Sequence, residues 1–475
     1  MTRNPTPKAP CLLTFLFALP ATGQERASKP SMVEIAAAYA AKVAASARFV
    51  SGRTLDSVLA EELAPDDPLS AMIRPLLKFE VDAKDKRVTC TIGTAKATAV
   101  ATGNLGCTLV HADVDSATLR ARAAPEPADA LPDPGTVDWP LGDRVPEAKV
   151  PDAVDRTALG NAIDAAFAEP ANGTKVRTRA VVVVHRGRLV AERYAEGYRA
   201  DMPLPGWSMT KTMVNALVGI RVRQGKLDLA APLQVPEWPA ADPRRALRLQ
   251  HLLTMTSGLH WNESYDDPGS QCLQMLFRSA DHAAVQALQP ADHAPGTTFC
   301  YASGTTNLIC RELRATFGSD LEYRAFPRDA LFLPLGMRSA VIETDPSGTF
   351  VGSSYGFATA RDWARLGMLY AQDGVCDGVR VLPAGWVAAS ATAVAASDGE
   401  YGRHVWLDAD PDGDGPRGRG WPDLPANLLR MDGHEGQYVC VFPTEQVVVV
   451  RLGCTKAGGF GLHELLRAVL AACRS

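Results

Sequence analysis

The stretch Gly206-Trp207-Ser208-Met209-Thr210-Lys211 decides how the rest of the chain is interpreted. It precedes an apolar run, 213–220, with the composition of a buried helix. A serine and a lysine three residues apart lie on one helical face, so the amine can reach the hydroxyl. Burial and the positive end of the helix dipole both disfavour the ammonium form of Lys211. The spacing therefore predicts a serine nucleophile activated by lysine, without histidine.

A serine and a lysine at this spacing also occur by chance, so a second signal is needed. Of the 12 lysines in the chain, only Lys211 has a serine three residues before it. Tyr301-Ala302-Ser303 is the one place among ten tyrosines where Tyr-x-Asn/Ser occurs. A tyrosine near an ammonium is biased toward the phenolate and can relay a proton. We predict that Ser208, Lys211 and Tyr301 are catalytic, and that Trp207, Ser303 and Tyr265 are candidate substrate contacts.

A third element should carry a cation or an imidazole, followed by x-Gly, next to a late strand. Three tripeptides match this pattern, beginning at His185, His434 and Lys456. Only His434 follows the tyrosine and leads into a strand with another strand and a helix after it. We expect Gly436 to let the strand backbone approach the substrate. The backbone N–H groups of Ser208 and Gln437 are then the predicted oxyanion donors.

These three elements, in this order, resemble the serine β-lactamase and penicillin-binding-protein superfamily, specifically its class C-like branch. The sequence around Ser208 is most similar to that of the 6-aminohexanoate-dimer hydrolases and related β-lactamase-fold esterases. Four further sequence segments also resemble this superfamily, at 250–259, 295–297, 333–337 and 358–367. The resemblance covers about 136–475. It implies an α+β fold of the β-lactamase/transpeptidase type, an antiparallel sheet flanked by helices with a large helical insert.

The resemblance also implies a reaction, the cleavage of an ester or amide through an acyl-enzyme without a metal or cofactor. The expected partner is a small-molecule ester, amide or peptide substrate. β-Lactamases typically carry Lys-Thr-Gly where this chain has His434-Glu435-Gly436. A neutral imidazole would lose the attraction for the carboxylate of a β-lactam, so we expect weak β-lactamase activity. β-Lactamase or D-alanyl-D-alanine peptidase activity and a non-turnover penicillin-binding sensor or scaffold stay open as alternatives.

The rest of the chain is interpreted by composition and periodicity. Residues 1–23 have the basic, apolar and small-residue regions of a signal peptide, which predicts export to the periplasm or secretion. Residues 24–125 form a small α/β extension, with helices at 32–50 and 54–63 and strands at 87–92 and 96–101. A Pro- and Asp-rich linker, 126–135, leads to the catalytic block, 136–475. Hairpins are predicted at 179–194 and 437–452, and a helix at 462–473.

Charge and cysteine content exclude several classes of function. With 49 Lys+Arg against 53 Asp+Glu, the formal charge is −4. The sequence thus lacks the excess of basic residues expected of a nucleic-acid-binding protein. No transmembrane segment is expected in the mature chain. Cys90 and Cys107 are the disulfide pair to test first, whereas Cys440 should face Val449 and so not Cys454. The loop 408–414 begins like an EF-hand, but Arg419 replaces the bidentate glutamate, so no metal site is expected.

Overall fold

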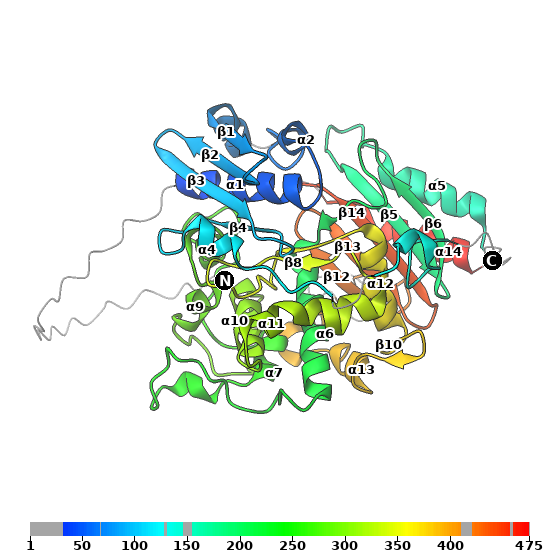
Figure 1. The fold of residues 1–475 in the computed structure, drawn as a ribbon. Coiled ribbons are helices and arrows are strands. Elements are labelled where there is room, and N and C mark those ends of the chain that lie inside the picture. Colours follow the sequence, from blue (N-terminus) through cyan, green and yellow to red (C-terminus); the bar gives the residue numbers. More distant parts are fainter. Residues whose placement is uncertain are drawn as a thin grey trace, which may run out of the picture.

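The computed structural model describes residues 32–66, 68–127, 131–145, 154–409, 420–456 and 459–474. The predicted signal peptide and most of the loop that begins like an EF-hand lie outside these residues. Figure 1 shows a small blue unit packed on a larger body. Among the described residues, no helix has the length and apolarity needed to cross a membrane. The same part of the chain contains no cluster of three His, Cys, Asp or Glu side chains that could hold a metal ion.

The body is built on a five-stranded antiparallel sheet in the order β12-β13-β14-β5-β6, so the first and last strands of the block lie together. Both predicted hairpins are confirmed, and Cys440 does pair with Val449. The strands are β5 (Thr178–His185), β6 (Arg188–Tyr194), β12 (Leu429–Gly433), β13 (Gln437–Phe442) and β14 (Val447–Gly453).

Helices cover both faces of this sheet, which explains why β5 is valine-rich and buried along its whole length. Val181 and Val183 pack against α5 (Arg156–Phe167) and α14 (Leu462–Cys473), at the right of Figure 1. Val182 and Val184 point the other way, toward α12 (Ala360–Ala371) and the helical insert. The predicted α+β fold, with an antiparallel sheet between helices and a large helical insert, is confirmed.

The insert lies between β6 and β12 and carries the functional segments. Its helices are α6 (Thr210–Arg223), α7 (Leu249–Leu253), α8 (Gln271–Arg278), α9 (His282–Ala287), α10 (Ser303–Arg314), α11 (Asp320–Pro327), α12 and α13 (Trp386–Ser390). Its short strands are β7 (Leu204–Pro205), β8 (Val341–Ile342), β9 (Gly356–Ala358), β10 (Val375–Cys376) and β11 (Val379–Arg380). Strand β9 lies between β7 and β8 in a small antiparallel sheet next to the start of α6.

The N-terminal unit consists of α1 (Met32–Phe49) packed on a four-stranded antiparallel sheet, β1-β2-β3-β4. Both predicted helices, the second of them shorter than expected, and both predicted strands are found, but two outer strands were not anticipated. Strand β1 is largely exposed and β4 has three residues, so neither shows the alternation by which a strand is recognised. The remaining elements are α2 (Leu55–Ala60), α3 (Pro68–Ile73), α4 (Ser116–Arg120), β1 (Lys78–Asp82), β2 (Arg87–Ile92), β3 (Ala95–Ala101) and β4 (Cys107–Leu109).

The suggested Cys90–Cys107 disulfide is wrong. All nine cysteines that the structure describes are free. Cys90 lies on β2 and Cys107 on β4, with β3 between the two strands. Two strand spacings amount to roughly 9–10 Å, more than a disulfide can span. Burial raises the pKa of the Cys90 thiol to about 11, as expected for an inert core cysteine.

The N-terminal unit is joined to the body by buried ion pairs. Arg179, at the start of β5, donates to Glu61 and Glu62 at 2.7 and 2.6 Å. Lys42 of α1 pairs with Glu343 of the body, and both side chains are almost completely buried. The sequence predicts a linker between two blocks but does not predict this shared interior.

Candidate active site

A tight turn presents Ser208 at the start of α6. A short helical turn, Trp207–Met209, leads directly into the helix, and Trp207 has a left-handed backbone with φ 48°. The Thr210 hydroxyl donates to the Trp207 carbonyl at 2.6 Å and accepts from the Gly356 N–H at 2.9 Å. A non-glycine residue with positive φ persists only where its surroundings hold it, so the strained residue directly before Ser208 marks a functional turn.

Lys211 lies one helical turn after Ser208, as the spacing predicted, and is 1% exposed. Its Nζ lies 3.0 Å from Ser208 Oγ, 3.1 Å from Ser303 Oγ and 3.0 Å from the Ser353 carbonyl oxygen. These partners are hydroxyls and a carbonyl rather than a carboxylate. Burial lowers the pKa of Lys211 to about 8, which confirms the predicted direction. About a tenth of the side chain is therefore a free amine at pH 7, far more than for a lysine with an ordinary pKa.

Tyr301, the third predicted catalytic residue, lies beside the other two. Its ring centroid lies 4.7 Å from Lys211 Nζ, and its hydroxyl is hydrogen-bonded to Ser208. Burial, together with the negative charge of Glu263, raises the pKa of Tyr301. The expectation of a phenolate is therefore wrong, because desolvation outweighs the nearby amine. Tyr301 is a neutral phenol that can donate a proton.

Glu263 is a site residue to which the sequence analysis assigned no role. Its carboxylate accepts hydrogen bonds from the Ser303 N–H at 2.9 Å, from the Ser303 hydroxyl and from the Trp261 indole. Ser303 is thus completely buried between Lys211 and Glu263, and does not face the substrate as predicted. The available signal was the position of Glu263 two residues before Tyr265, a predicted cleft residue.

The third element lies beside Ser208, and of its three predicted residues His434 lines the cleft whereas Gly436 and Gln437 do not. Strand β12 ends at Gly433, and Glu435 and Gly436 both adopt positive φ in the turn that follows. A Cβ on Gly433 would lie 2.2 Å from the Gly206 carbonyl oxygen, so only glycine fits this close approach.

Gly436 and Gln437 are not among the residues that line the cleft at Ser208. The Gly436 carbonyl accepts from Arg451 at 2.7 Å, and the Gln437 side chain bonds to the backbone of Gly453. Gly433 and His434 line the cleft instead. The Gln437 N–H as an oxyanion donor stays a prediction, and the residues between His434 and Gln437 form a turn rather than part of a strand.

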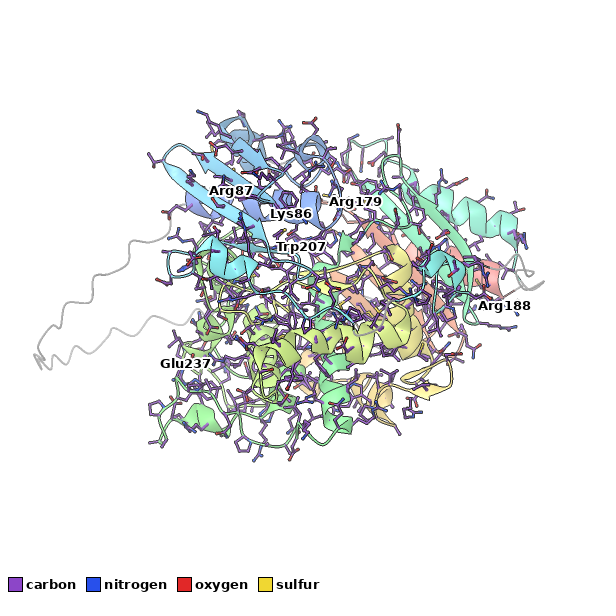
Figure 2. The ribbon with its side chains drawn as sticks, viewed as in Figure 1. Lys86, Arg87, Arg179, Arg188, Trp207 and Glu237 are labelled. Carbon is purple, nitrogen blue, oxygen red and sulfur yellow. The ribbon has the colours of Figure 1, made fainter. Side chains whose placement is uncertain are left out.

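An open cleft of about 310 Å³ leads to Ser208. His434 forms part of its wall and stacks on Tyr265, with ring centroids 4.4 Å apart and planes at 14°. Trp207 packs edge-on against the same imidazole at 5.5 Å and is itself buried next to α1 (Figure 2). The cleft is lined by Ser208, Glu263, Tyr265, Tyr301, Glu400, Trp406, Arg430, Asp432, Gly433, His434 and Tyr438.

One wall of the cleft carries charged side chains that the sequence analysis missed. Arg430 and Asp432, both on β12, form an ion pair at 3.0 Å, and Glu400 lies in the same wall. A buried histidine, His404, was missed as well. Its Nδ1 lies 3.1 Å from the Lys211 carbonyl oxygen, and burial lowers its pKa to about 3, so it supports α6 as a neutral ring. Neither feature lies in a motif.

Comparisons with known proteins place this geometry in a family. A 6-aminohexanoate-dimer hydrolase from Paenarthrobacter ureafaciens is 30% identical over 223 residues, which are 44% of this chain and 56% of that protein. The match thus spans little more than half of the relative's length.

Solved structures agree on the fold. One provisionally assigned as a 6-aminohexanoate-dimer hydrolase from Bacillus anthracis is 22% identical with a TM-score of 0.51, covering 62% of this chain and 78% of that one. One provisionally assigned as a β-lactamase from Bacteroides dorei is 16% identical with a TM-score of 0.52, covering 67% and 99%. The β-lactamase family model matches residues 163–472, well over half of the chain. The chain therefore belongs to the β-lactamase family, as its motifs predicted.

Proposed function

We propose that this protein is a serine hydrolase that cleaves an ester or amide bond through an acyl-enzyme at Ser208. The observation that carries the proposal is the buried amine of Lys211, 3.0 Å from the Ser208 hydroxyl. A buried lysine with a pKa of about 8 can accept the hydroxyl proton at neutral pH, which an ordinary lysine rarely does.

The reaction follows from the protonation states in the site. Lys211 accepts the Ser208 proton while Oγ attacks the substrate carbonyl carbon. When the tetrahedral intermediate collapses, the bond to the leaving group breaks and the neutral Tyr301 phenol donates a proton to it. Tyr301 regains a proton from the Lys211 ammonium. Water then hydrolyses the acyl ester, which releases the acid and restores the Ser208 hydroxyl.

We propose that backbone groups on two sides of the cleft stabilise the oxyanion. Ser208 contributes the N–H at the start of the helix, where the helix dipole is positive. The end of β12, at Gly433 and His434, lies against the residues just before Ser208. We propose that a backbone N–H of this segment, in place of the Gln437 N–H, is the second donor.

The charges in the cleft favour uncharged esters and linear amides over carboxylate-bearing β-lactams. Arg430 is a cation in the wall, but Asp432 pairs with it, and Glu400 and Glu263 add negative charge. One relative is, by its name, a hydrolase of the 6-aminohexanoate dimer, which supports hydrolysis but does not bear on the charge of the substrate. β-Lactam hydrolysis and D-alanyl-D-alanine peptidase activity are the second candidate, and Arg430 is the observation that favours them.

Labelling and turnover test the proposal together. The protein is treated with a fluorophosphonate, and the adduct is mapped by mass spectrometry. It is then assayed with p-nitrophenyl esters, linear amides, D-alanyl peptides and a chromogenic cephalosporin. We expect the label on Ser208, no activity in Ser208→Ala, and a kcat/KM for the best ester or amide above that for the cephalosporin.

Other results would identify the alternatives. Labelling at another residue, or near-wild-type activity in Ser208→Ala, contradicts the proposal. Stoichiometric labelling without turnover of any substrate points to a penicillin-binding sensor or scaffold.

We also propose that the chain is exported, since residues 1–23 carry a signal-peptide pattern. Expression in a bacterial host, followed by mass spectrometry of the periplasmic and cytoplasmic fractions, tests this. A periplasmic protein that begins near residue 24 is expected, and an intact chain confined to the cytoplasm would contradict the proposal.

A further inference from the structure

The N-terminal unit packs next to the turn Trp207–Met209, called here the nucleophile turn. Ile35 and Ala38 of α1 belong to the same apolar cluster as Trp207 and Tyr355 of the body. A cavity of only about 30 Å³ separates α1 from this turn, and Lys42, Trp207 and Tyr355 are among its lining residues. Figure 2 shows Trp207 below the blue helix. The residue that directly precedes Ser208 is therefore enclosed on one side by a part of the chain outside the family match, 163–472.

A buried polar cluster joins the two parts at this place. Glu343 of the body pairs with Lys42, accepts a hydrogen bond from Ser46 at 2.9 Å and accepts another from the Cys107 N–H at 2.7 Å. All three of these donors belong to the N-terminal unit. Because a buried carboxylate requires such partners, the position of Glu343 depends on α1 and β4.

From this cluster a short series of contacts reaches the nucleophile. Lys42 Nζ lies 4.0 Å from the ring centroid of Tyr355, a cation–π distance. The Tyr355 ring packs edge-on against Trp207, with centroids 6.4 Å apart. Trp207 has φ 48°, a conformation that its surroundings have to maintain. Any freedom gained by Trp207 changes the direction from which Ser208 Oγ approaches the substrate.

We propose that the N-terminal unit is a built-in support of the nucleophile, and that Lys42 is a positioning residue that acts on Ser208 through Tyr355 and Trp207. The inference rests on the proposed role of Ser208. It assigns a function to a unit in which no chemical motif was found. Small misplacements of a reacting group have large effects on rate, so this contact should be visible in kinetics.

The test removes both charges together, so that neither is left buried alone. Lys42→Met/Glu343→Gln is compared with the full-length wild type. The matched control is Asp66→Asn/Arg177→Gln, which removes another ion pair between the same two parts, 2.8 Å long, whose residues do not line the cavity next to Trp207. The rate of fluorophosphonate labelling, kcat, KM and the pH dependence of kcat are measured for all three proteins.

We expect the Lys42/Glu343 variant to lose about tenfold or more in labelling rate and in kcat, consistent with a misplaced nucleophile. KM and the pH midpoint of kcat should stay unchanged, because neither the cleft wall nor Lys211 is altered. The control should stay within about twofold of the wild type, since exposed pairs contribute little.

A second pair of variants keeps the test decisive if the double variant does not fold. Tyr355→Leu removes the ring between Lys42 and Trp207 and leaves the ion pair in place, whereas Tyr355→Phe keeps the ring. The leucine variant should lose about tenfold in labelling rate, as a misplaced nucleophile does, and the phenylalanine variant should be near wild type.

Three results would overturn the inference. They are wild-type labelling rates in the folded Lys42/Glu343 or Tyr355→Leu variants, an equal loss in the control, and a shifted pH midpoint, which would indicate an electrostatic effect on Lys211. If the wild type itself is not labelled at Ser208, the proposed function fails first, and the two failures are thereby distinguished.

Discussion

Two lysines, Lys42 and Lys211, are buried within this protein, and their surroundings are opposite. Lys42 is 3% exposed and is paired with the buried carboxylate of Glu343. Lys211 is 1% exposed and contacts two hydroxyls and a carbonyl, while the nearby carboxylate of Glu263 bonds to Ser303 instead. An ion-paired lysine stays an ammonium, whereas one surrounded by neutral groups gives up its proton more easily.

The difference shows that burial alone does not decide what a lysine can do, because the groups around it matter as well. Lys42 contacts the Glu343 carboxylate and so joins two parts of the chain. Lys211 has a pKa of about 8 and can act as a base. A single hydroxyl, that of Ser303, separates Lys211 from a carboxylate that would otherwise keep it protonated.

Replacing each lysine by methionine should separate the two roles most clearly. Lys211→Met is expected to lower kcat at least about 10²-fold, as removal of a general base does, while the protein stays folded. Tyr301→Phe should have a similar effect, and the two losses should not be additive, because one proton passes through both groups. Steady-state kinetics and circular dichroism check this. Unchanged kcat in both variants would disprove the catalytic assignment.

The next largest expected effect is the loss of protein stability when one partner of the Lys42–Glu343 pair is removed. Removing one partner, as in Lys42→Met or Glu343→Gln, should cost about 3–5 kcal/mol of unfolding free energy, because the other group is left buried alone. Lys42→Met/Glu343→Gln should recover most of this loss. Urea denaturation of the three variants measures it. A double variant as unstable as the sum of the singles would show that the pair is not coupled.

The pH dependence of activity tests whether the free amine of Lys211 acts as the base. Since only the free amine of Lys211 accepts the serine proton, kcat/KM should rise about tenfold per pH unit well below pH 8 and level off above it. Glu263 and Cys272 are the charged or titratable groups that act on Lys211. Measuring kcat/KM against pH, on a substrate that is stable to base, tests whether the rate rises with pH. A rate that falls between pH 6 and 8 would exclude Lys211 as the base.

A smaller effect is expected where a charge is paired at the surface of the cleft. Asp432→Asn leaves Arg430 without its partner, so the ratio of cephalosporin to ester kcat/KM should rise by several-fold, up to about tenfold. Glu400→Gln is the control for a general loss of negative charge. His434→Lys should shift the ratio in the same direction. A ratio that does not respond to Asp432→Asn would show that Arg430 does not reach the substrate.

Local sequence patterns predicted the elements that are periodic and bounded by clear signals. The two hairpins of the body and its last helix were predicted because alternating valines and turn glycines act within a few residues. Strand β1 was missed because it is largely exposed. The proposed Cys90–Cys107 bond failed because sequence separation does not show that β3 lies between them.

The sequence alone predicts the contact between Ser208 and Lys211, since the two residues are one helical turn apart and their contact needs no other part of the chain. It also determined the family through motifs in a set order. Only the tertiary structure decided that Tyr301 is a neutral phenol, that β12 meets Ser208 at Gly433, and that Lys42 reaches the nucleophile turn. These properties depend on burial, on backbone register and on contacts between residues hundreds of positions apart, which no local pattern records.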